Sequence, residues 1–218
     1  MTKKILKFAA IGILTLALTN CKDKAEEVET TTVEETAETT AISTKYKVNT
    51  DISNISWKGF KPTGSHEGTI AIESGVITMN GDAIESGTFL IDMNSIVVTD
   101  IPAEDEGNAK LAGHLKSDDF FHVEEYPSSA FDVTAFEMKD GKAMLSGNLK
   151  MKDATNNITI PVTVSENGNT VTITSDKFSI DRSKWNIKYG SKSFFDDLGD
   201  KFINDDMELQ ITISANKA

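Results

Sequence analysis

The stretch GHLKSDDFFHVEEYPSSAF, residues 113 to 131, decides how the rest of the chain is interpreted. It combines a histidine, an acidic turn, two adjacent phenylalanines and a Tyr-Pro pair in one short segment. The segment is too apolar for a solvated loop and too irregular for one long helix. Because strands are predicted on both sides of it, we expect a compact aromatic plug that closes one end of a sheet structure.

The spacing within this plug predicts its local structure. A helix is predicted over residues 107 to 115, the best helical window of the chain. Ser117 is expected to cap a short turn that carries Phe120 and Phe121, because its hydroxyl can accept a hydrogen bond from a free amide. His114 is expected to reach Asp118 one helical turn further along.

On both sides of the plug, apolar and polar residues alternate with a period of two, which predicts half-buried strands. Turn signals such as Asn80-Gly81 and Asp140-Gly141 separate these strands at hairpin spacing. Many such strands favour an all-β fold, a single closed antiparallel barrel of about eight strands, because closure removes exposed edges. An open sandwich of the same strands is the alternative.

The plug also carries a resemblance to a known family. From His114 to Phe131 the chain follows the pattern HLKSxDFFxVxxYPxxxF and resembles the YceI-like family. Three further stretches agree in the right order, namely residues 46–68, 147–162 and 178–191. The departures lie in turns, at Asn186 and at Lys152-Asp153, where glycine is commoner in the family. The resemblance implies a lipocalin-like barrel that holds a polyisoprenoid or a similar long amphiphile.

The chain begins with features typical of an exported protein. Three lysines precede an apolar run from Phe8 to Leu18, which is too short to favour a membrane span and predicts a lipoprotein signal peptide over residues 1–20. Cys21 is the only cysteine, so no intramolecular disulfide can form, and its position predicts lipidation. A buried or reactive thiol is the alternative. Lys22 favours the outer membrane of a cell envelope, on its periplasmic or its surface face.

Residues 21–44 are rich in Glu, Thr and Ala and contain no aromatic residue before the domain begins. Such a segment buries too little apolar surface to offset its ordering entropy, so we expect a disordered tether that reaches roughly 25 to 30 Å. Residues 45–218 then form one domain. The formal net charge of −12 argues against nucleic acid as a partner.

Small residues occur on the predicted inward face of the strands, at Gly68, Ala135 and Gly147. They leave room for a ligand or let neighbouring groups approach closely, and ordinary dense packing is the alternative. The residues expected to bind the ligand lie on inward strand positions, in the plug and at the Arg182 corner: Trp57, His66, Ile70, Phe89, Ile91, Phe120, Phe131, Leu149, Phe178, Arg182 and Trp185.

Two of these residues have a second interpretation. Arg182 is the only arginine, and it can hold a ligand head group or form a corner salt bridge beside Asp181. His66 can donate to a ligand oxygen or be a satisfied core histidine. The acidic run from Asp196 to Asp206 is expected to be a solvated rim, and the apolar residues within it can form a lid or tuck beneath the barrel mouth.

The sequence shows no nucleophile elbow, no glycine-rich phosphate loop and no histidine spacing typical of metal ligands. We therefore expect no catalytic residue, no metal and no cofactor. The predicted function is non-catalytic binding, with transport or sequestration of a long isoprenoid or fatty amphiphile. An envelope adhesion domain that uses the barrel as a scaffold and a hydrolase of the bound amphiphile are the alternatives. Pairing of two domains as a homodimer is left open.

Overall fold

A computed structural model describes residues 25–40 and 42–218. Cys21 and the expected signal peptide lie outside the described residues. The elements in chain order are β1 Glu26–Glu27, β2 Thr30–Thr31, β3 Thr44–Val48, β4 Asn54–Lys61, β5 Gly64–Asn80, β6 Ala83–Asp92, η1 Met93–Ser95, β7 Val97–Val98, α1 Glu106–Lys116, β8 Ser128–Lys139, β9 Lys142–Met151, β10 Ala154–Asn167, β11 Thr170–Ser175, β12 Phe178–Asp181, η2 Arg182–Trp185, η3 Gly199–Lys201 and β13 Asp206–Lys217.

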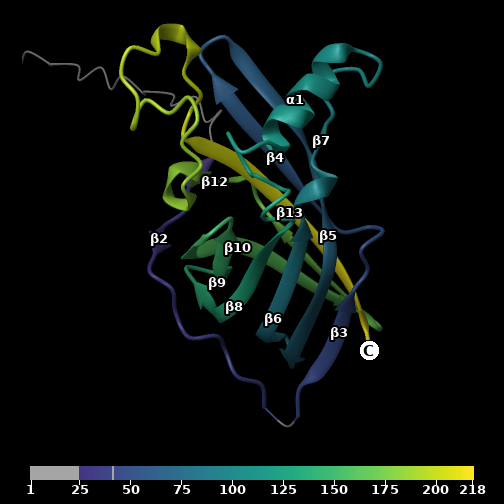
Figure 1. The fold of residues 1–218 in the computed structure, drawn as a ribbon. Coiled ribbons are helices and arrows are strands. Elements are labelled where there is room, and N and C mark those ends of the chain that lie inside the picture. The colour runs from purple at the N-terminus through teal and green to yellow at the C-terminus, as the bar shows by residue number, and fades with distance from the viewer. Residues whose placement is uncertain (1–24, 41) are drawn as a thin grey trace, which may run out of the picture.

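The strands belong to one sheet, and eight of them pair in a closed ring. The order around the ring is β3–β5–β6–β8–β9–β10–β11–β13, and β13 returns to β3 through pairs such as Ala215 with Val48. β4 also bridges β5 and β13 at the end of the ring where α1 lies (Figure 1). The prediction of a mostly β fold is confirmed, and the alternative of separate open sheets is wrong because the strands are joined in one.

The alternation of the sequence matches the two faces of the sheet over most strands. Phe89 and Ile91 of β6 and Ile158 and Ile160 of β10 are buried in one core cluster. Of their neighbours on the other face, Thr88, Asp92, Asn157 and Thr159 are polar, whereas Leu90 and Pro161 are apolar and partly exposed. Burial of these apolar side chains is the main favourable contribution to the stability of the ring, at about 25 cal/mol per Å² of apolar surface.

One strand departs from the predicted phase. The register of β8 against β9 shifts between Val133 and Ala135, which marks a β-bulge at Thr134. A bulge adds one residue to one strand and so exchanges the faces beyond it. Ala135 is therefore exposed, and Phe136 packs against the core instead. The prediction that Ala135 faces inward is wrong for this reason.

The segment from residue 25 to residue 40, here called the strap, lies along the outside of the ring (Figure 1). β1 pairs in parallel with β12, and β2 pairs with β10 at Asn157 and Ile158. β11 pairs with β10 only from Val162 onward, so the strap covers edges that the ring leaves open. The described part of the expected disordered tether is thus hydrogen-bonded to the domain.

Buried side chains hold the middle of the strap. The Nδ2 of Asn148 donates to Glu34 O at 2.7 Å, and Glu34 N donates back to Asn148 Oδ1 at 3.0 Å. Further along, Ala37 N donates to Val133 O, and Thr40 N donates to a carboxylate oxygen of Glu85. Hydrogen bonds to the backbone of the strap explain why it is ordered. Such bonds form whatever the side chains are, so the low apolar content that predicted a disordered tether does not prevent them.

The predicted helix, α1, runs into the plug. It begins after Asp105, and the Asp105 side chain accepts a hydrogen bond from Gly107 N. Ser117 ends this helix instead of capping the following turn, because its hydroxyl donates to His114 O. His114 contacts Asp119 at 2.9 Å, so the expected partner Asp118 is wrong by one residue. Within the described parts of the chain, no helix is long and apolar enough to cross a membrane.

Candidate ligand-binding site

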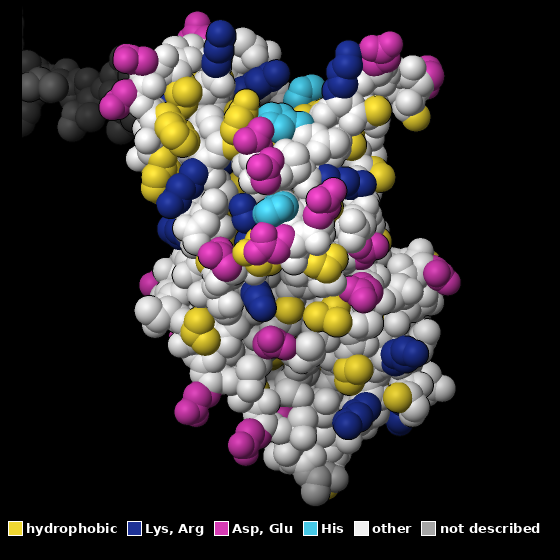
Figure 2. All heavy atoms as spheres, in the orientation of Figure 1, with side chains coloured by type: hydrophobic (Ala, Val, Ile, Leu, Met, Phe, Trp, Pro, Cys, Tyr) yellow, Lys and Arg dark blue, Asp and Glu magenta, His cyan; other side chains and the backbone are white. Residues whose placement is uncertain are grey.

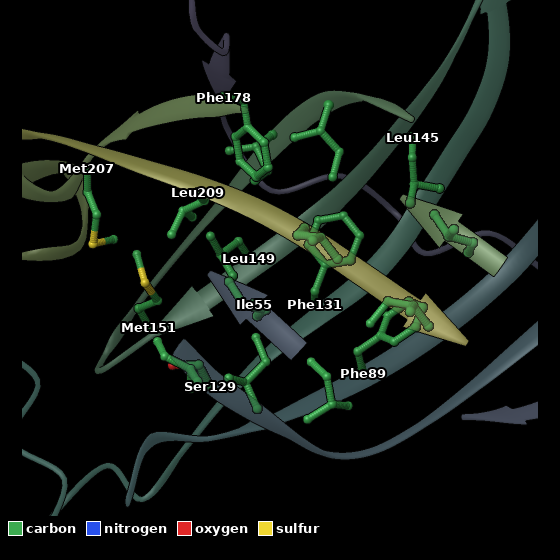
Figure 3. Close-up of a pocket in the computed structure, with 18 of the residues that line it drawn as sticks. Ile55, Phe89, Ser129, Phe131, Leu145, Leu149, Met151, Phe178, Met207 and Leu209 are labelled. Atoms are coloured by element: carbon green, nitrogen blue, oxygen red, sulfur yellow. The ribbon is translucent and has the colours of Figure 1, made fainter. Parts of the chain in front are cut away.

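The ring encloses an apolar cavity of about 90 Å³ (Figure 3). Ser129 is the one polar residue in its wall. A water molecule needs only about 10 to 15 Å³ on this scale, but an apolar wall gives it no partners, so a space of this kind favours an apolar occupant. Six of the predicted ligand-binding residues line the cavity: Ile70, Phe89, Ile91, Phe131, Leu149 and Phe178.

β13 contributes a part of the wall that the candidate residues omitted. Met207, Leu209 and Ile211 face the cavity, and Figure 3 shows the first two among its lining side chains. Their alternation with Glu208 and Gln210 is visible in the sequence and could have identified them. They remain partly accessible although they face inward, which indicates empty space in front of them.

The small residues of the inner face have a packing role. A Cβ added to Gly147 would lie 2.3 Å from the ring of Phe131, and one added to Gly68 would lie 2.8 Å from the ring of Trp57. Gly147 therefore lets the Phe131 ring approach the strand closely. Gly68 lets the Trp57 ring approach and also the backbone of β7, since its added Cβ would lie only 1.9 Å from Val97 O. Phe131 also packs against Phe89, with ring centroids 6.4 Å apart.

A second space of about 240 Å³, here called the mouth, adjoins the inner cavity. The two share the wall residues Ile70, Phe121 and Met207. The mouth is more polar than the cavity, and it contains four further candidate residues: Trp57, His66, Phe120 and Arg182. The arrangement is therefore an apolar interior next to an entrance with hydrogen-bonding groups.

Arg182 is only 4% exposed and is used by the protein itself. Its guanidinium donates to the carbonyls of Ile187, Tyr189, Ile203 and Asn204 at 2.7 to 3.1 Å. Its charge is balanced by Asp205 at 3.4 Å, whereas Asp181 accepts from Ser183 N. Burial lowers the pKa of Arg182, and the negative charges of Asp205 and Asp181 oppose that shift. Arg182 thus has a structural role, and its ion pair is with Asp205.

The two histidines at the mouth are each held by a carboxylate. His66 Nδ1 lies 2.9 Å from Asp100, and its side chain is one third exposed, so it is not a core histidine. Burial works against ionisation of Asp100, but hydrogen bonds from Glu67 N and His66 outweigh it, and the pKa of Asp100 is lowered. His114 packs edge-on against Phe120 and Tyr189.

The two tryptophans differ in the donors they leave available. Trp185 is fully buried, donates from Nε1 to Leu149 O at 2.8 Å, and lines neither the cavity nor the mouth. Trp57 lines the mouth, and its buried Nε1 finds no acceptor among the described residues. A buried donor without a partner is costly, so Trp57 Nε1 is an unsatisfied group next to the mouth. Composition alone could not distinguish the two rings.

The acidic run between η2 and β13 is partly structural. Asp205 accepts from Ser191 Oγ and Ser193 Oγ as well as pairing with Arg182. Ile203 packs over Gly190 and lines the mouth, whereas Phe194 and Phe195 are exposed. Across residues 25–40 and 42–218, no three His, Cys, Asp or Glu side chains are grouped in a way that could hold a metal ion.

The strands thus form a ring around an apolar cavity, and a more polar mouth adjoins that cavity. The model of the YceI-like domain matches residues 46–215, and the chain belongs to that family. The departure at Asn186 fits this assignment, because Asn186 adopts the positive φ that turns commonly give to glycine. In the Lys152-Asp153 turn the positive φ lies at Lys152, so Asp153, which stands where the family commonly has glycine, does not need one.

Solved structures share the fold. BcnA of Burkholderia cenocepacia is 22% identical, with a TM-score of 0.56 over 78% of this chain and 99% of its own. A polyisoprenoid-binding domain from Saccharophagus degradans, implicated in plant cell wall breakdown, is 12% identical, with a TM-score of 0.56 over 79% of this chain and 98% of its own. No curated protein matches the chain.

Proposed function

We propose that this protein binds a long-chain apolar amphiphile, such as a polyisoprenoid or an isoprenoid quinone, inside a lipocalin-like barrel. It carries or sequesters that amphiphile in the cell envelope without transforming it. The observation that supports this function is the inner cavity, whose wall is apolar except for Ser129. The polyisoprenoid-binding neighbour from Saccharophagus degradans agrees with this ligand class.

The energetics of burial suit a site that recognises its ligand by the length of the apolar chain. Each methylene that leaves water contributes about 0.8 kcal/mol, so the chain alone provides firm binding. The head group would lie at the mouth, where the partly exposed His66 ring can accept or donate. Arg182 does not take part, because its donors already hold backbone carbonyls.

The alternatives are less well supported. An adhesion scaffold predicts a fully packed interior, whereas the ring encloses a cavity. A hydrolase needs a nucleophile or an activated water beside His66 or His114. In the described chain the hydrogen-bond partners of these two rings are the carboxylates Asp100 and Asp119, and no Ser, Thr or Cys side chain is bonded to either ring.

Native mass spectrometry of the full chain, purified from its own envelope, tests the binding function. We expect to find a long-chain amphiphile bound in stoichiometric amount. We also expect to recover this amphiphile unchanged after incubation with the protein. A protein that remains empty when challenged with polyprenols, quinones and fatty amides would overturn the proposal.

A matched pair of variants tests whether the ligand occupies the cavity. Leu209→Phe fills space in front of β13 and should lower ligand loading at least tenfold. Gln210→Phe adds the same ring on the exposed side of the strand and should leave loading unchanged. Equal loading of the two variants would place the ligand elsewhere.

The proposed envelope address has a separate test. We propose that Cys21 carries a lipid and anchors the protein in the outer membrane. Labelled palmitate should be incorporated into the wild-type chain and not into Cys21→Ala. Incorporation that persists in the variant would exclude this anchor.

A further inference from the structure

Exposed aromatic side chains gather in one part of the molecule, the segment from residue 186 to residue 205, here called the aromatic loop. Phe194 is 48% exposed, Phe195 is 51% exposed, and Tyr189 is also exposed. The other large hydrophobic residues exposed in the described chain are aliphatic and lie outside this loop. Single exposed apolar residues are ordinary, but adjacent exposed phenylalanines on one loop indicate an interaction surface.

Lysines accompany these rings. Lys188 Nζ lies 4.6 Å from the centroid of Phe194, and Lys192 Nζ lies 3.6 Å from that of Phe202. A lysine can lay its apolar stem along a ring that enters lipid while its ammonium stays at the head groups. Figure 2 shows hydrophobic and basic side chains close together on the upper left of the molecule, where Figure 1 places this loop.

The charges of the loop identify the kind of surface it fits. Residues 186 to 205 include three lysines, at 188, 192 and 201, and four aspartates, at 196, 197, 200 and 205, so 3 − 4 gives −1. Asp205 is paired with Arg182, and this ion pair leaves the rest of the loop with a net charge of zero. The whole chain has a net charge of −12. A loop without net charge is suited to a lipid surface without net charge. Insertion of apolar side chains, and not attraction to anionic lipids, would hold the loop on that surface.

The aromatic loop is also one wall of the mouth. Tyr189 packs against His114 and Phe120, and Ile203 lines the mouth directly. The Arg182 guanidinium holds the carbonyls of Ile187 and Tyr189 at one end of the loop and those of Ile203 and Asn204 at the other. The two ends of the loop are therefore fixed beside the mouth. Phe194 and Phe195 are tied to the first end, because their N–H groups both donate to Ser191 O and the Ser191 hydroxyl donates to Asp205.

We propose that Phe194 and Phe195 insert into a lipid bilayer with a zwitterionic surface and seat the mouth against it, so that the amphiphile passes between bilayer and cavity without crossing water. The transfer of the amphiphile in this inference rests on the proposed binding function. The insertion into the bilayer depends on the aromatic loop alone.

An environment-sensitive dye tests the docking in the full chain. The dye is attached at Ser193→Cys in a Cys21→Ser background, and the protein is mixed with phosphatidylcholine vesicles. We expect the dye to move into an apolar environment, and the added changes Phe194→Ser and Phe195→Ser to abolish that shift. A dye at Asp140→Cys, on the distant β8–β9 turn, serves as the control and should stay in water. Replacing part of the lipid by phosphatidylglycerol should not strengthen the shift.

Several results would overturn the docking. The dye at residue 193 could remain in water with vesicles present, or the two serine substitutions could leave its shift unchanged. A dye that is already shielded before vesicles are added, in a protein that sediments as a dimer, would assign the surface to a second copy of the chain.

Uptake of a polyprenol separates this inference from the binding function. The double serine variant should reach the same final occupancy as wild type but load from vesicles at least tenfold more slowly. If wild type loads polyprenol while the dye stays in water, the docking is wrong and the binding function stands. If the dye enters the bilayer and no polyprenol is taken up, the docking stands and the binding function is wrong.

Discussion

Arg182 is buried at a point where four backbone carbonyls and one carboxylate converge. The carbonyls of Ile187 and Tyr189 are near Arg182 in the chain, whereas those of Ile203 and Asn204 come 21 and 22 residues later. Asp205 supplies the opposite charge. The neighbouring Asp181 was the obvious partner in the sequence, yet it caps η2. Local spacing cannot reveal a partner that arrives through a loop of some twenty residues, so this part of the site was not predictable.

Replacing this side chain tests its structural role. Arg182→Met leaves Asp205 buried without its counter-charge and should lower the free energy of unfolding by about 3 to 5 kcal/mol. Urea denaturation measures the change. Lys184→Ala, which removes a partly exposed ion pair with Glu27, is the control and should cost no more than about 1 kcal/mol. A small effect at Arg182 would mean that its contacts contribute little.

Asp100 gives a pH dependence with a definite sign. Its pKa is lowered in the folded protein, so its ionised form adds stability above the ordinary aspartate pKa of about 3.9, and this stability is lost as the pH falls through the folded pKa. Asp100→Asn should be about 1 to 2 kcal/mol less stable than wild type at pH 5. The difference should shrink toward pH 3, as urea titrations at both pH values will show. A constant difference would contradict the assignment.

Gly147 permits the close approach of Phe131, and a methyl group there would displace the ring. Gly147→Ala should therefore cost about 1 to 3 kcal/mol of stability. Gly59→Ala is the matched control, since no atom lies within 4 Å of its added Cβ. Thermal unfolding of the two variants measures the difference, and equal midpoints would exclude the packing role of Gly147.

Among the elements, the strands were the most predictable and the strap was the least. Strict alternation located most inward residues, including those that line the cavity. The bulge at Thr134 cannot be seen in the alternation of the sequence, because Ala135 and Phe136 are both apolar. Ala135 was therefore expected to face inward, whereas Phe136 does. The strap was mistaken for a tether because compositional rules count buried apolar surface and not backbone pairing.

The reciprocal bonds between Asn148 and Glu34 offer a test of the strap. Asn148→Ala removes both bonds and leaves the backbone groups of Glu34 without them, so hydrogen exchange over residues 30 to 37 should become faster. It also removes the bond that Asn148 Oδ1 accepts from the buried Asn157, and stability should fall by about 1 to 3 kcal/mol in all. Thr163→Ala, at an exposed position of β10, is the control. Unchanged exchange in the strap would mean that the strand pairs of β1 and β2 hold it alone.

At the scale of the whole molecule, the closed ring and its two adjoining spaces predict that the ligand supports the fold. A ligand that binds only the folded state stabilises it by about 2.7 kcal/mol when present at one hundred times its dissociation constant. Removal of the bound amphiphile by solvent extraction should therefore lower the unfolding temperature of the wild-type protein.

The cavity-filled variant is the control for this experiment. Leu209→Phe should unfold at the same temperature before and after extraction, because its cavity has less room for a ligand. A loss of stability that is equal in both proteins would show that extraction itself damages the fold.

The strap has one consequence for how far the protein can travel. Only three residues lie between Ala25, where the described chain begins beside β12, and the proposed anchor at Cys21. The four steps from Cys21 to Ala25 span at most about 14 Å, half the reach expected of a free segment. If Cys21 is lipidated, we expect the domain to stay close to the leaflet that holds its anchor. It would then exchange ligand with that membrane and could not reach the membrane on the opposite side.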